Sequence, residues 1–255
     1  MLGLVEGATE FVPVSSTGHL IVVSDWLDLV DERAKTFDIF IQLGAILAIV
    51  WLYRRRLGHV LVSVGGDPAS RRFAMNLLIA FLPAGLVGFL AHDWIKARLF
   101  NPEVVAVALV VGGVLILLIE RWSPPSSVTS VNDVSPPTAL GIGLVQVLSL
   151  VPGTSRSGAT ILGGYALGLS RVAATEFSFF LAIPVMLAAT VYDLLKSWQS
   201  LAPTDAPMFA VGFVVSFVSA LIVVQAFLKY LSAHSFAVFA WYRIAFGTLL
   251  LLARG

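Results

Sequence analysis

Two short polar runs interrupt an otherwise apolar chain, and their residue types suit the binding of phosphate. The first run precedes His19 directly and consists of Ser15, Ser16, Thr17 and Gly18. The second run consists of Thr154, Ser155, Arg156, Ser157 and Gly158. A helix start offers free N–H groups and a positive dipole end to an anion, and a guanidinium can bind two phosphate oxygens. We therefore expect one phosphate site built from both runs, the plainer alternative being that they only cap helices.

Two carboxylates precede the first run. Glu6 and Glu10 are four residues apart, so they share one face of a helix. Two carboxylates held together in a low dielectric either share a proton or need a cation. Carboxylate, hydroxyl and water oxygens are the ligands of a hard divalent cation. Both alternatives stay open: a metal held by Glu6 and Glu10, or two carboxylates that line a wet cleft without one.

The same segments contain a set of side chains suited to phosphoryl transfer. The candidate catalytic residues are Glu10, Ser16, His19 and Arg156. In one scheme His19 attacks phosphorus and Glu10 orients the imidazole ring. In the other scheme Ser16 attacks and His19 accepts its proton. Arg156 would stabilise the phosphoryl oxygens in either scheme, and the sequence does not choose between them.

The composition places these polar residues in a membrane protein. The chain has 255 residues, of which 58% are hydrophobic and 12% charged, with a mean hydropathy of +0.92. A soluble domain carries about twice that charged fraction. Cysteine is absent, which excludes disulfide and thiolate chemistry, and 16 basic against 15 acidic residues do not favour a nucleic-acid partner. We expect a polytopic protein whose solvent is the lipid bilayer.

The fold class expected is an all-α integral membrane protein. Six apolar segments are candidate transmembrane helices: 36–53, 74–95, 102–120, 175–195, 208–231 and 235–253, the last broken only by Arg243. Segments 1–29 and 139–169 are each split near a proline, at Pro13 and Pro152. Each half has about 12 residues, or about 18 Å of helix, which is too short to cross. We expect two re-entrant helix–loop–helix hairpins, the alternative being two kinked spans, and we expect no cleavable signal peptide.

The two split segments resemble each other and indicate an internal repeat. GLVEGATEFVPVSSTGH at 3–19 aligns with GLVQVLSLVPGTSRSGA at 143–159. The single membrane domain would then consist of two halves, 1–122 and 139–255, joined by a polar linker over 123–138. Three crossings in each half give the second half an inverted topology. The basic loop with Arg54, Arg55, Arg56, Arg71 and Arg72 is expected in the cytoplasm, so the first hairpin opens to the outer face.

These motifs also resemble a known family. EGATEFVPVSSTGH at 6–19 and PGTSRSGAT at 152–160 are similar to the signature regions of the bacterial undecaprenyl-diphosphate phosphatases of the bacitracin-resistance type. The resemblance covers nearly the whole chain. It implies a hydrolase of the bacterial cytoplasmic (inner) membrane that removes the terminal phosphate of a long-chain isoprenyl diphosphate. The product is the lipid carrier used in peptidoglycan synthesis.

The resemblance also implies a cofactor and site residues. A divalent cation, Mg²⁺ or Ca²⁺, is expected with the ExxxE motif of Glu6 and Glu10. Ser16, His19 and Arg156 match the family's functional positions, and the site is expected to open to the outer, periplasmic side. The main rival is a transporter or flippase for a phosphate-bearing lipid or anion, because inverted repeats with broken helices are typical of transporters. The oligomeric state stays open, with a homodimer as one option.

Overall fold

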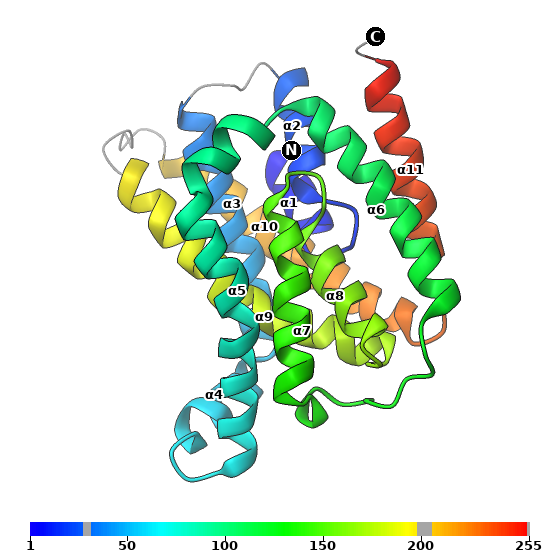
Figure 1. The fold of residues 1–255 in the computed structure, drawn as a ribbon. Helices are drawn as coiled ribbons and strands as arrows, with labels where there is room; N and C mark the ends of the chain where they lie inside the picture. The colour runs from blue at the N-terminus through cyan, green and yellow to red at the C-terminus, as the bar shows by residue number, and fades with distance from the viewer. Residues whose placement is uncertain (28–31, 198–205, 254–255) are drawn as a thin grey trace.

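In the part of the chain that the structure describes, the regular elements are helices, apart from one isolated β-bridge between Val128 and Leu169. The computed structural model describes residues 1–27, 32–197 and 206–253. Figure 1 shows a bundle in which the helices run between two ends, one carrying the C-terminus and the other carrying α4. The helices are α1 (Leu2–Thr9), α2 (Ser16–Trp26), α3 (Glu32–Leu52), α4 (Arg54–Ser63), α5 (Pro68–Leu99), α6 (Pro102–Trp122), η1 (Val131–Asp133), α7 (Pro136–Gln146), η2 (Val147–Leu150), α8 (Arg156–Ala166), α9 (Arg171–Ser197), α10 (Ala206–Leu231) and α11 (Ala237–Leu252).

Several helices satisfy the length and composition needed to cross a membrane. Within the described residues, α5, α6, α9 and α10 do so on their own, while α3 and α4 pass the test together as a pair bent by 74°. The 16 residues of α11 are fewer than the roughly 20 that a straight span needs. The expectation of an all-helical polytopic membrane protein is confirmed, with four spans, or five if the bent pair is one span.

Both split segments are broken where the prolines predict. The chain leaves α1 before Pro13 and begins α2 at Ser16, and it leaves η2 before Pro152 and begins α8 at Arg156. In Figure 1 the first pair of helices enters the bundle from the end that carries the C-terminus, and the second pair enters from the end that carries α4. The breaks meet inside the bundle, where the Ser157 hydroxyl donates to the carbonyl of Val12 at 3.0 Å.

The two breaks share an unusual backbone conformation. Among the described residues, Ser15 and Ser155 are the two non-glycine residues with positive φ, at 70° and 73°. Each occupies the N-cap of the helix that follows its break. L-residues pay a steric cost at positive φ, so the same costly geometry occurs at matching places of the two segments. A side chain offsets part of this cost at one of them, because the Ser155 hydroxyl accepts a hydrogen bond from the Gly158 N–H at 3.0 Å.

Helix starts elsewhere follow a common pattern of a polar cap and a proline. Asp67, Asn101 and Ser135 cap α5, α6 and α7, and a proline follows each of them. Proline is tolerated at the first helical position because its missing N–H would have no partner there. The Ser70 hydroxyl, the Ser70 N–H and the Ala69 N–H all donate to Asp67 and lower the pKa of its carboxyl. Asp67 lies in the turn between α4 and α5.

The short helices of the split segments pack closely on long ones. Gly3 lets α1 approach the backbone of Gly212 in α10, where an added Cβ would lie 3.2 Å from the carbonyl carbon. Gly143 does the same for α7 against α5, with an added Cβ 2.5 Å from the Ala80 carbonyl oxygen. The first split segment therefore packs against a helix from the second half of the chain, and the second split segment packs against a helix from the first half.

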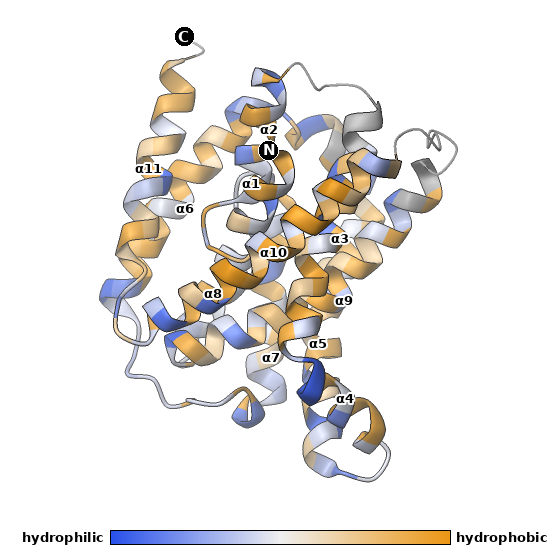
Figure 2. Cartoon of the chain, turned by 180° about the vertical axis from the view of Figure 1, so that it is seen from behind, coloured by the Kyte–Doolittle hydropathy of each residue, from blue (hydrophilic) through white to orange (hydrophobic). Residues whose placement is uncertain are grey.

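Aromatic side chains fill the core next to the breaks. Phe11 is fully buried and meets the Phe179 ring edge-on at 5.5 Å between centroids. Phe177 and Phe180 of α9 are also fully buried. Figure 2 shows hydrophobic colouring along α10 and hydrophilic colouring at the start of α4. Apolar surface on the long helices and a rigid aromatic centre suit a bundle in lipid that supports a polar site at its middle.

Candidate active site

The two breaks are joined by an ion pair between Arg156 and Glu10. Nη2 of Arg156 lies 2.7 Å from Oε1 of Glu10, although the residues are 146 positions apart in the chain. Their side chains are 11% and 10% exposed. Two charges removed from water in this way need each other, because the loss of one partner leaves the other uncompensated. The expected approach of the arginine to the acidic motif is therefore present in the structure.

Ser16 completes a chain of three side chains. Its hydroxyl donates to Oε2 of Glu10, so the two oxygens of this carboxylate serve different partners. Ser16 is buried and is the first residue of α2. A carboxylate that accepts the hydroxyl proton of a serine can activate that oxygen for attack. This role for Glu10 differs from both schemes considered from the sequence, in which histidine was either the nucleophile or the base.

The second break has its own hydrogen-bond network. The hydroxyls of Ser155 and Ser157 lie 3.1 Å apart, and Ser155 also caps the Gly158 N–H. Thr154 donates its N–H to the Val151 carbonyl at 3.1 Å. These residues hold the backbone in a fixed turn at the start of α8. The expected phosphate-binding residues of this run are therefore packed around the first turn of a helix whose dipole is positive at that end.

Helix α9 supports the arginine from behind. Nη1 of Arg156 donates to the Ser178 carbonyl at 3.4 Å, and Nη2 lies 3.2 Å from the Met186 sulfur. The Thr160 hydroxyl lies 2.6 Å from the Ser178 hydroxyl and 2.9 Å from the Arg156 carbonyl, to which it donates. Neither of these hydrogen bonds involves the charged atoms of the ion pair. The guanidinium also faces the Phe11 ring at 5.6 Å. Within the described residues, Nε of Arg156 is buried without a hydrogen-bond partner, which leaves a donor for an anion.

The contacts of His19 are to the first break and to α11. Its Nδ1 lies 2.7 Å from the Ser15 carbonyl and its Nε2 lies 2.5 Å from the Tyr242 hydroxyl. The ring also stacks on Phe246 with centroids 4.6 Å apart. The hydrogen bonds of His19 thus go to Ser15 and to α11 rather than to Glu10 or Ser16. Tyr242 gave no signal in the sequence, because its partner is 223 positions away.

The remaining residues of the first run lie in the first turn of α2. Thr17 is partly buried there. Gly18 is buried against α6, where an added Cβ would lie 3.4 Å from side-chain atoms of Val105 and Leu109. Gly18 therefore serves the contact between α2 and α6.

Glu6 is the second carboxylate of the acidic pair. It is 0% exposed, and among the described residues neither of its carboxylate oxygens has a hydrogen-bond partner. An isolated buried carboxylate is costly unless a proton or a cation neutralises it. The orphaned oxygens therefore fit the expected divalent cation. In the described residues, however, no group of three or more His, Cys, Asp or Glu side chains is arranged to hold a metal, so hydroxyl, backbone, substrate or water oxygens would have to complete the shell.

One arginine near the site was not given a partner from the sequence. Arg243 of α11 is 1% exposed, and its guanidinium reaches backbone carbonyls in both breaks. Backbone acceptors carry no side-chain signal, which explains why the sequence did not reveal them.

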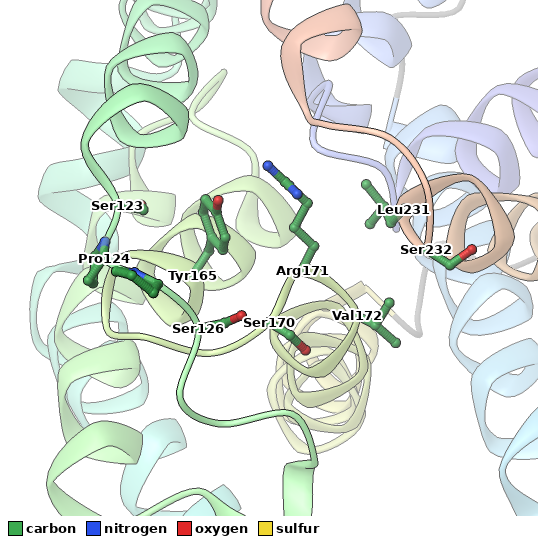
Figure 3. A pocket seen from close by; sticks show the side chains of 10 residues that line it. Ser123, Pro124, Ser126, Tyr165, Ser170, Arg171, Val172, Leu231 and Ser232 are labelled. Atoms are coloured by element: carbon green, nitrogen blue, oxygen red, sulfur yellow. The ribbon is translucent and has the colours of Figure 1, made fainter.

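Two cavities lie outside the Glu10–Arg156 pair. One of about 490 Å³ is lined by Tyr165 and Arg171 and by serines of the linker and α10 end, as Figure 3 shows. Arg171 is paired there with Glu120 at 2.9 Å. The other, of about 480 Å³, is lined by valines of α6 and by Leu148, Val151 and Thr154 of the second split segment. Its mostly apolar lining suits a hydrocarbon chain, and Thr154 precedes Arg156 by two positions in the sequence.

Comparison with known proteins finds relatives that match nearly the whole chain. The chain is 57% identical over 252 residues to the undecaprenyl-diphosphatase of Nitrosospira multiformis, covering 99% of this chain and 92% of that protein. It is 55% identical over 251 residues to the undecaprenyl-diphosphatase of Methylococcus capsulatus, covering 98% and 92%. The family model described as bacitracin resistance protein BacA matches residues 1–249. The chain therefore belongs to the BacA family of bacitracin resistance proteins.

Proposed function

We propose that the chain is an undecaprenyl-diphosphatase of the bacterial cytoplasmic membrane. It hydrolyses the terminal phosphate of undecaprenyl diphosphate and yields undecaprenyl phosphate, a lipid carrier for peptidoglycan synthesis, and inorganic phosphate. The full-length similarity to proteins of that name supports this activity. The single structural observation in its favour is the continuous contact from Ser16 through Glu10 to Arg156 across the two breaks.

In the proposed reaction Ser16 is the nucleophile. Glu10 accepts its proton while the hydroxyl oxygen attacks the terminal phosphorus and the bond to the bridging oxygen breaks. Undecaprenyl phosphate leaves, and water then hydrolyses the phosphoserine to release inorganic phosphate. Arg156 holds the non-bridging oxygens, with its free Nε and the N–H groups at the start of α8 as further donors.

Two further groups have supporting roles. His19, held by Tyr242, is placed one turn after Ser16 and can supply a proton to the leaving phosphate. A divalent cation held by Glu6, with Glu10 nearby, would neutralise charge on the diphosphate. The buried, unpartnered oxygens of Glu6 support that position for the cation.

The same proposal includes the arrangement in the membrane. The chain forms two inverted repeats. Each repeat has one re-entrant hairpin and three crossings: α1–α2 with α3, α5 and α6, and α7–α8 with α9, α10 and α11. The opposite entry of the two hairpins and the matching positive φ of Ser15 and Ser155 support this arrangement. The arginines at the start of α4 favour a cytoplasmic position for that end, so the first hairpin and the site open to the periplasmic side.

A phosphoserine trap tests the mechanism. Purified protein in detergent is mixed with a long-chain isoprenyl diphosphate, quenched with denaturant at neutral to slightly alkaline pH, where phosphoserine and phosphohistidine both survive, and analysed by peptide mass spectrometry. We expect phosphate on Ser16 and none in Ser16→Ala, together with a fall in kcat of at least about 10³-fold for Ser16→Ala and Arg156→Ala. Phosphate found on His19 instead would refute the serine mechanism. A transporter without phosphatase activity would release no phosphate in detergent, where no gradient exists.

A further inference from the structure

Arg243 is bound entirely by backbone carbonyls from three separate segments. Nε and Nη2 donate to the α6 carbonyls of Leu109 and Ala108, at 3.3 and 3.0 Å. Nη1 donates to Pro13 of the first break at 3.3 Å. The carbonyls of the second break complete the set, with Thr154 at 2.9 Å from Nη1 and Gly153 at 3.0 Å from Nη2.

This set uses the full donor capacity of the side chain. A guanidinium has five N–H groups in a fixed planar fork, and the structure gives it five carbonyl acceptors. Lysine has three donors on a flexible stem and cannot reproduce such a pattern. A guanidinium with all five N–H groups bonded fixes the relative positions of α6 and the two breaks, because a shift of any one of them breaks its bonds to Arg243.

The bonds also set the direction of the backbone at the second break. In a planar trans peptide the carbonyl and the following N–H point to opposite sides. Drawing the Thr154 carbonyl toward Arg243 therefore turns the N–H of Ser155 away from it. Ser155 and Arg156 follow directly and lead into α8. Arg243 thus orients the peptide groups that precede the phosphate-binding helix start.

Glycine makes room for the fork. An added Cβ on Gly112 of α6 would lie 2.6 Å from Cζ of Arg243, inside van der Waals contact. An added Cβ on Gly158 would lie 3.2 Å from Nη1. The space for the guanidinium is therefore built by residues from both halves of the chain, and it can be closed without altering Arg243 itself.

We propose that Arg243 is a positioning residue for catalysis. It holds the first break, which carries Glu10 and Ser16, and the second break, which carries Arg156, in the relative position that the reaction needs. The inference rests on the site proposed above. Arg243 acts through the carbonyls of Pro13, Gly153 and Thr154 and does not touch the substrate. Without the guanidinium of Arg243, Arg156 would still bind the substrate. The Ser16 oxygen would, however, no longer be held at attacking distance from the phosphorus.

The test separates kcat from KM. We expect Arg243→Lys and Arg243→Gln to lower kcat about 10²-fold, the cost of a displacement near 1 Å, while KM for isoprenyl diphosphate changes little. Arg171→Lys is the matched control, because this arginine binds Glu120 away from the breaks, and it should retain normal kcat. Circular dichroism and size-exclusion chromatography show whether each variant is folded. A raised KM with normal kcat would overturn the proposal, as would normal values of both.

Gly112→Ala provides a second test that leaves the arginine in place. It should lower kcat in the wild-type background and lower it much less in Arg243→Lys, because both changes act on the same fork. Additive losses in the double variant would refute the proposal even if Arg243→Gln fails to fold. The phosphoserine trap keeps the two proposals apart. If Ser16 is phosphorylated but Arg243→Lys turns over normally, only the role of Arg243 fails, whereas an active Ser16→Ala contradicts the site itself.

Discussion

Glu10 determines the charge balance of the site, because its two oxygens serve an arginine and a serine at once. In the absence of substrate the carboxylate neutralises Arg156, whose charge is largely removed from water. A diphosphate brings its own negative charge and competes for the same guanidinium. In the proposed mechanism, binding of substrate would free one carboxylate oxygen of Glu10 while the other still accepts from Ser16. The ion pair would then be a resting state that the substrate opens.

This competition predicts the behaviour of Glu10→Gln. The amide keeps the size of the side chain but removes the charge that competes with phosphate for Arg156. We expect inorganic phosphate to bind to this variant, and to inhibit it, more tightly than the wild-type protein. We also expect kcat to fall by about 10²-fold or more, because the base is lost. Titration calorimetry with phosphate and steady-state kinetics measure the two effects. Weaker phosphate binding by this folded variant would show that Glu10 does not compete for the arginine.

Sequence and structure differ at the residue scale in an instructive way. Glu10 and Arg156 could be identified as candidates because ionisable side chains are rare in apolar segments, and Ser16 because it lies in a hydroxyl-rich run at the first break. Tyr242 and Arg243 could not be assigned roles, because their partners are a distant imidazole and backbone carbonyls. A carbonyl acceptor depends on the path of the chain and not on residue type, so only the folded structure reveals it.

The two breaks are the elements that make the site. Pro13 and Pro152 predict where each first helix stops, since proline cannot continue the hydrogen bonding of a helix. The positive φ of Ser15 and Ser155 could not be predicted, because glycine or asparagine is the usual choice there. The 74° bend between α3 and α4 was not predicted either. An apolar segment followed by arginines indicates where a span ends, but it does not indicate the direction of the helix that follows.

The positive φ predicts an effect on stability that a matched pair isolates. Ser15→Gly and Ser15→Ala both remove the hydroxyl, so they differ only by one methyl group and by the backbone freedom that its absence allows. With φ at 70° and ψ at 94°, we expect the glycine variant to be more stable than the alanine variant by about 1 kcal/mol. Thermal unfolding in detergent measures the difference. Equal melting temperatures would mean that the first break adopts another conformation in solution.

At the scale of the whole molecule, opposite entry of the two hairpins explains how a polar site forms in a chain this apolar. In the proposed arrangement each hairpin reaches only part of the way through the bundle. The two breaks meet where α9 and α11 supply the Ser178 carbonyl and the Arg243 guanidinium. The sequence predicted this meeting from the similarity of 3–19 to 143–159. It did not predict that each hairpin would pack on a long helix of the other half, because that contact depends on glycines with no polar signal.

The proposed topology predicts which end of the bundle faces the cytoplasm. The natural chain has no cysteine, so one introduced thiol can be labelled selectively. Gly65 lies in the turn after α4 with open space around it, and Phe100 is exposed in the turn between α5 and α6. In Figure 1 the junction of α5 and α6 lies at the end of the bundle away from α4. In intact spheroplasts a membrane-impermeant maleimide should label Phe100→Cys and leave Gly65→Cys unlabelled until the membrane is permeabilised, because the arginines of α4 retain that end in the cytoplasm. The reverse pattern would place the opening of the first hairpin, and with it the site, on the cytoplasmic side, whereas labelling of both in intact spheroplasts would exclude an odd number of crossings between them.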